Sequence, residues 1–96
     1  MTPASEYILK LYTTGTTPKL ESGIGSLLRA FDQHLKGHYE FRIINILDNP
    51  KLAEVDRILA TPTLIKEEPP PVKRVIGDIS NTDKVLAGLD IAKRRF

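Results

Sequence analysis

Two consecutive segments of this chain each combine a short apolar run with a following stripe of apolar residues at helical spacing. The first has an aromatic and aliphatic run over residues 7–12, closed by a Thr-Gly-Thr-Thr-Pro turn, which predicts a strand. The second has a run over residues 39–47 that is alternating and then almost entirely aliphatic, which predicts a strand entering the interior. Two strand–helix units in series favour parallel strands joined by a right-handed crossover.

The two helical stripes differ in length and in the signals at their ends. The longer one predicts a helix over residues 18–36, in which Thr17 caps the first turn, Pro18 takes the first position and Gly37 provides a left-handed exit. Its apolar stripe consists of Leu20, Ile24, Leu27, Leu28, Phe31 and Leu35. The shorter stripe follows the helix-start signal Asp48-Asn49-Pro50 and predicts a short amphipathic helix. Its apolar residues are Leu52, Val55, Ile58 and Leu59.

Two further strands and a last helix are predicted in the remainder of the chain. Residues 63–66 and 72–76 are short apolar-rich runs, and their connection over residues 67–71 is too short for a crossover helix, so they should pair antiparallel. Ser80 with Asp83 forms a variant capping box that predicts the start of a final helix. The apolar residues of that helix would be Val85, Leu86, Leu89 and Phe96.

The resulting order, βαβαββα, is the thioredoxin-like α/β arrangement, a mixed sheet with helices on both faces. A chain of 96 residues has room for about one small core, so we expect a single domain over residues 1–96. The sequence shows no secretion signal, and no apolar segment approaches the roughly 20 residues that a membrane span needs. We therefore expect a cytoplasmic protein without membrane contact.

The absence of cysteine excludes thiol chemistry. In a thioredoxin-like domain the redox cysteines would follow the first strand, but here that place is occupied by Gly15-Thr16-Thr17-Pro18. A hydroxyl cannot exchange disulfides, and no phosphate-binding loop is present, so we expect no catalytic residue and no cofactor. Thr16 and Thr17 could instead form a ligand-binding surface with Pro62, which precedes a strand where such folds often have a cis proline. By itself Pro62 would be trans, since only about 5–6% of X-Pro bonds in folded proteins are cis.

Metal and nucleic-acid sites are not favoured. His34 and His38 are four residues apart, but Gly37 should end the helix between them and no third ligand is evident, so we expect exposed histidines and no metal. The net charge of +2 does not imply a polyanionic partner. The basic groups at residues 73–74 and 93–95 could bind nucleic acid, although a solvated strand edge and helix end explain them more simply.

Five stretches of the sequence resemble the KaiB family of circadian clock proteins. They are YILKLY at 7–12, NPKLAE at 49–54, ILATPTL at 58–64, PPPVKRVIGD at 69–78 and KVLAGLD at 84–90. The resemblance implies a non-enzymatic protein that binds the N-terminal ATPase ring of KaiC and then sequesters KaiA. It also implies two folds. The C-terminal half would be βααβ in a resting tetramer and αββα in a binding-competent monomer, and only the second agrees with the predicted order βαβαββα.

The resemblance also assigns roles to particular residues. Those expected to contact a KaiC-type ATPase are Pro50, Lys51, Leu52, Glu54, Arg57 and Lys66. Those expected to control the balance between the two folds are Tyr7, Gly88 and Asp90. The prolines expected to shape or stiffen the changing segments are Pro62, Pro69, Pro70 and Pro71.

Two departures from the family pattern limit what the resemblance implies. Ser22 stands where clock members have an arginine associated with KaiA contact, and the sequence ends Lys93-Arg94-Arg95-Phe96 in place of an acidic extension. KaiA binding is therefore not implied. The alternatives left open are a KaiB-like role in a stress or other timing response without KaiA, a redox-inactive thioredoxin-like ligand-binding module, and a nucleic-acid-binding module.

Overall fold

The computed structural model describes residues 6–91 and has the predicted element order. The elements are β1 (Tyr7–Thr13), α1 (Pro18–Leu35), β2 (Tyr39–Asn45), α2 (Pro50–Val55), β3 (Thr63–Glu68), β4 (Lys73–Ile76) and α3 (Thr82–Gly88). The four strands form one sheet in the order β2-β1-β3-β4. β1 and β2 are parallel, whereas β3 is antiparallel to both β1 and β4. The predicted thioredoxin-like fold is confirmed.

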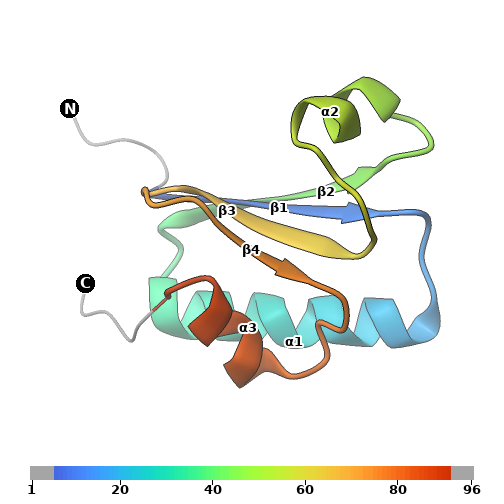
Figure 1. Ribbon diagram of the computed structural model, residues 1–96. Coiled ribbons are helices and arrows are strands. Elements are labelled where there is room, and N and C mark those ends of the chain that lie inside the picture. The colour runs from blue at the N-terminus through green and yellow to red at the C-terminus, as the bar shows by residue number, and fades with distance from the viewer. Residues whose placement is uncertain (1–5, 92–96) are drawn as a thin grey trace.

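The helices lie on both faces of the sheet. α1 and α3 cover one face, and α2 stands over the other (Figure 1). Alternate residues of β1, namely Tyr7, Leu9 and Leu11, belong to the buried core with α1 and α3. The ring of Phe31 in α1 lies 5.6 Å from that of Tyr39 in β2 and packs edge to face against it. Each fully buried large apolar side chain contributes about 1.5–3 kcal/mol, so the α1 face accounts for most of the apolar stabilisation.

The ends of α1 follow the sequence closely. Thr17 is the N-cap, its hydroxyl accepts a hydrogen bond of 3.1 Å from the Leu20 N–H, and Pro18 starts the helix. At the other end the left-handed conformation begins one residue before the predicted Gly37, because Lys36 has φ 52° and Gly37 has φ 82°. The two residues together turn the chain into β2.

The predicted short helix is present as α2, but its apolar side chains are not buried against the sheet. The helix ends at Val55, and none of its residues is buried. Leu52, Val55 and Leu59 are 47%, 77% and 95% exposed. The contacts recorded between this segment and the sheet are polar: Lys10 and Tyr12, from the face beneath α2, both bond to Asp56 at the end of the helix.

The predicted cap of α3 is also wrong. Asn81, not Ser80, caps this helix, and its Oδ1 accepts a hydrogen bond of 3.1 Å from the Lys84 N–H. The Ser80 N–H instead donates to Asp78 Oδ1 at 2.9 Å, which closes a turn ahead of the helix. Of the predicted apolar residues, Val85, Leu86 and Leu89 are buried as expected, and Phe96 lies outside the described residues. Between residues 6 and 91 no helix is both long enough and apolar enough to cross a membrane.

Candidate functional site

Exposed apolar side chains lie on α2 and on the segments just before and after it. They belong to Leu47, Leu52, Val55 and Leu59, which are 71%, 47%, 77% and 95% exposed and are called here the α2 surface. Large apolar side chains left exposed together on one short segment are typical of an interaction site. The predicted partner residues Pro50, Lys51, Glu54 and Arg57 are exposed on the same short segment.

Asn45, at the end of β2, organises the start of this segment. Its side-chain oxygen accepts a hydrogen bond of 2.9 Å from the Leu47 N–H, and its carbonyl accepts one of 3.1 Å from the Asn49 side chain. These bonds reverse the chain so that Pro50 begins α2 over the sheet. Sequence reasoning did not single out Asn45, although asparagine after a strand is a typical turn signal.

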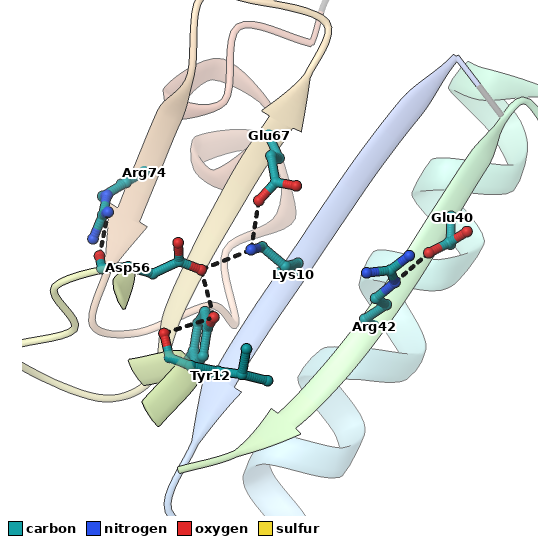
Figure 2. A network of polar contacts seen from close by, with 8 residues as sticks. Lys10, Tyr12, Glu40, Arg42, Asp56, Glu67 and Arg74 are labelled. Carbon is teal, nitrogen blue, oxygen red and sulfur yellow. Dashed lines mark hydrogen bonds and ion pairs between the residues drawn. The ribbon is translucent and has the colours of Figure 1, made fainter. Parts of the chain in front are cut away.

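The end of α2 is attached to the sheet by a polar network (Figure 2). Lys10 Nζ lies 2.7 Å from Asp56 Oδ2 and 2.5 Å from Glu67 Oε2, and the hydroxyl of Tyr12 donates to the same Asp56 oxygen. Lys10 and Tyr12 alternate with the core residues of β1, so their side chains lie on the opposite face, beneath α2. The β1–β3 register shifts between Ile8 and Leu9, which leaves Glu67 out of the ladder.

The network changes the ionisation of its members. Burial raises the pKa of Asp56, but the hydrogen bonds from Lys10 and Tyr12 outweigh it and leave the pKa below its ordinary value. Burial lowers the pKa of Lys10, and the bonds to Asp56 and Glu67 more than reverse this. Burial and the bond to Asp56 raise the pKa of Tyr12 to about 12. At neutral pH Lys10 is therefore a cation, Asp56 a carboxylate and Tyr12 a neutral phenol.

Arg74 on β4 connects the same end of α2 to the edge of the sheet. Its guanidinium donates to the carbonyl of Asp56 and, at 3.4 Å, to that of Arg57. Arg57 has φ 54°, a left-handed conformation that ends the α2 segment. Lys73 and Arg74 were considered for nucleic-acid binding. Arg74 instead bonds to backbone carbonyl groups of this protein, whereas Lys73 is exposed.

Lys66 does not lie with the other predicted partner residues. It is 3% exposed and is opposite Leu9 in the β1–β3 ladder. Paired residues share a face, and Leu9 is in the core, so Lys66 lies on the α1 side of the sheet, away from α2. In this structure it is not part of the α2 surface.

The predicted fold-control residues occupy the α1 and α3 side. Tyr7 is buried at the start of β1. A Cβ placed on Gly88 at the end of α3 would lie 2.7 Å from Cγ2 of Val75 in β4. Asp90 has φ 59°, in the left-handed region that favours glycine.

The remaining predicted positions are distributed over the loops. The bonds preceding Pro62, Pro69 and Pro71 are cis. His34 and His38 are half-buried, not exposed as expected, and no group of three candidate metal ligands occurs within residues 6–91. Thr16, Thr17 and Pro62, considered for ligand binding, do come together and line a common cavity of about 360 Å³.

These features define a thioredoxin-like domain that has threonines in the place of a redox dithiol and a short, apolar-surfaced second helix. The KaiB domain model matches residues 10–91, and the chain belongs to the KaiB family. It is 52% identical over 85 residues to a circadian clock oscillator protein KaiB of Thermostichus vulcanus, covering 88% of this chain and 79% of that protein. It is 50% identical over 91 residues to KaiB of Synechococcus sp. strain CC9311, covering 95% and 76%.

Solved structures give the same fold. The N-terminal domain of Synechococcus elongatus SasA matches with a TM-score of 0.65 at 23% identity, covering 100% of this chain and 94% of that one. Mitochondrial thioredoxin 3 of Saccharomyces cerevisiae matches with a TM-score of 0.67 at 13% identity, covering 90% and 78%. At these identities the likeness concerns the fold alone.

Proposed function

We propose that this protein is a non-enzymatic clock or timing adaptor that binds the N-terminal ATPase ring of a KaiC-type protein through the α2 surface. The observation that carries the proposal is the exposure of Leu52 and Val55 on a helix that buries none of its residues, together with that of Leu59 just beyond its end. Neighbouring charges, including Lys51 and Arg57, would give orientation and on-rate at the rim of such an interface. The proposal places the protein in the cytoplasm.

The proposal includes a second packing of the C-terminal half. In the described part of the chain, five of the seven exposed large apolar residues fall after Pro50, namely Leu52, Val55, Leu59, Val72 and Ile76. A βααβ arrangement, or a dimer or tetramer formed from it, would have apolar surface available there to bury. The described αββα packing would then be the binding-competent form. If it is populated at about 1%, the apparent affinity is reduced roughly 100-fold.

Binding is tested by biolayer interferometry with a cyanobacterial KaiC ring in the presence of nucleotide. Val55→Asp should weaken association by about tenfold or more, because a carboxylate would be buried at the centre of the contact. Ile43→Asp is the matched control, since Ile43 is also exposed but is opposite the core residue Leu11 in the β1–β2 ladder, on the sheet face away from α2. Equal affinities for the two variants, or no binding of the unaltered protein, would contradict the proposal.

The second packing is tested separately, by native mass across a concentration series together with NMR of the monomer. Replacing Gly88 by Ala and Asp90 by Arg, at the positions that the family resemblance assigns to fold control, should shift the chain to monomer and speed association. A single set of NMR signals with unchanged mass and kinetics in both proteins would remove the second packing from the proposal and leave the docking surface intact.

A further inference from the structure

A cavity of about 360 Å³ lies at the end of β1, where three connections meet. They are the β1–α1 connection at residues 14–17, the loop before β3 at Thr61 and Pro62, and the β4–α3 loop at residues 78–80. The volume is within the range of small-molecule sites. No residue of the α2 surface lines the cavity, so binding of a ligand here would be independent of the proposed docking function.

Thr13 provides a polar group at the inner wall of this cavity. It continues the row of β1 residues that faces α1, in which Leu9 and Leu11 are fully buried, and it is itself 2% exposed. Its backbone carbonyl accepts from the Ile46 N–H, but its hydroxyl makes no hydrogen bond within residues 6–91. Within residues 6–91, every side-chain nitrogen or oxygen that is fully enclosed has a hydrogen-bond partner. Because the Thr13 hydroxyl has none there, it is not fully enclosed and must belong to the 2% of Thr13 that is exposed. A nearly buried hydroxyl is costly unless it is bonded, and a ligand atom in the cavity could bond to it.

The walls of the cavity have one charge of each sign. Lys19, in the first turn of α1, lines the cavity, and its positive charge also acts on Asp78. The dipole of α1 favours a negative charge at the same end of the helix. Asp78, from the β4–α3 loop, brings a carboxylate. A backbone hydrogen bond from Ser80 is the main reason that the pKa of Asp78 is lowered, so the group is ionised at neutral pH.

We propose that this cavity binds a small zwitterion of amino-acid or dipeptide size. The ligand's carboxylate would lie at the start of α1 beside Lys19, its ammonium group at Asp78, and a polar backbone atom at the Thr13 hydroxyl. The Asp78 carboxylate opposes binding of a simple anion, and the α1 terminus opposes binding of a simple cation. A ligand that has both charges satisfies both walls.

The proposal is tested by NMR titration of the full chain with glycylglycine, with acetate and ethylammonium as probes that each have one of the two charges. Glycylglycine should give saturable shifts, in about the millimolar range, at the amides of Gly15, Thr16, Thr61 and Ser80. Asp78→Asn should weaken glycylglycine binding by about tenfold and leave acetate binding no weaker. Asp83→Asn, in α3 and outside the cavity, should leave it unchanged.

Thr13→Val, which keeps the shape of the side chain, should also weaken glycylglycine binding, with the rest of the spectrum showing that the fold is retained. Three results would each overturn the proposal. They are shifts that do not saturate, shifts that acetate reproduces at the same ionic strength, and an affinity that Asp78→Asn does not alter.

Discussion

The Nζ of Lys10 and the Oδ2 of Asp56 lie 2.7 Å apart and join the middle of β1 to the end of α2. Their side chains are only 12% and 22% exposed, so the pair is screened less than a surface ion pair. Because α2 has no buried residue, this contact and its neighbours Tyr12 and Glu67 hold the helix over the sheet. Because polar contacts hold α2 in place, its apolar side chains remain exposed and could contact a partner.

Asp56→Asn should lower the free energy of unfolding by about 1–3 kcal/mol, because it removes a charged partner from a partly buried lysine. Urea denaturation followed by circular dichroism measures the change. Glu40→Gln is the control, since it breaks the exposed Arg42–Glu40 pair of the same face (Figure 2) and should change stability by less than about 0.5 kcal/mol. Equal effects of the two substitutions would show that the Asp56 network contributes no more than a surface pair.

The same network predicts acid sensitivity. The pKa of Asp56 is lowered in the folded protein from its ordinary value of 3.8, so the unfolded chain takes up the proton first. The stability contributed by Asp56 is therefore present above pH 3.8 and is lost as the pH falls through the lower folded pKa. When the pH falls from about 5 to 2, the Asp56→Asn protein should therefore lose less stability than the unaltered chain. Asp78, whose pKa is also lowered, is present in both proteins and adds the same acid-induced loss to each. Parallel stability curves for the two proteins would contradict this.

Arg74→Ala should loosen α2 without unfolding the sheet. A six-residue helix is marginal alone, and the Arg74 guanidinium satisfies carbonyl groups at its end. Amide hydrogen exchange at Ala53 and Ile58 should become about tenfold faster, with β1 amides unchanged. Lys73→Ala, which alters the exposed neighbour on the same strand, is the control and should leave α2 exchange as it is.

The local signals of α1, β1 and β3 predicted the fold well, because apolar pattern there coincides with burial. The run at 39–47, expected to enter the interior, instead forms the edge strand β2, which has no buried residue and leaves Ile43 50% exposed. The local signals also predicted a helix at α2, but there the apolar residues Leu52 and Val55 are exposed, and Leu59 lies beyond the end of the helix. Periodicity reports which residues share a helix face but not what that face contacts. The polar network could not be predicted either, since Lys10 and Asp56 are 46 residues apart and meet only through the sheet topology. Lys10 within an apolar run was the one local sign of a polar face.

Gly88 and Val75 provide a last test, of the packing between α3 and β4. Alanine at position 88 gains about 1 kcal/mol of helix propensity, but its Cβ would lie 2.7 Å from Cγ2 of Val75, so the valine must move. Gly88→Ala should therefore stabilise the αββα packing more in a Val75→Ala background than in the unaltered chain, with a coupling of about 1 kcal/mol. A double-mutant cycle of unfolding free energies measures this. Strict additivity would mean that α3 does not pack on Val75 in solution, which is the result expected if the C-terminal half is mainly in its other arrangement.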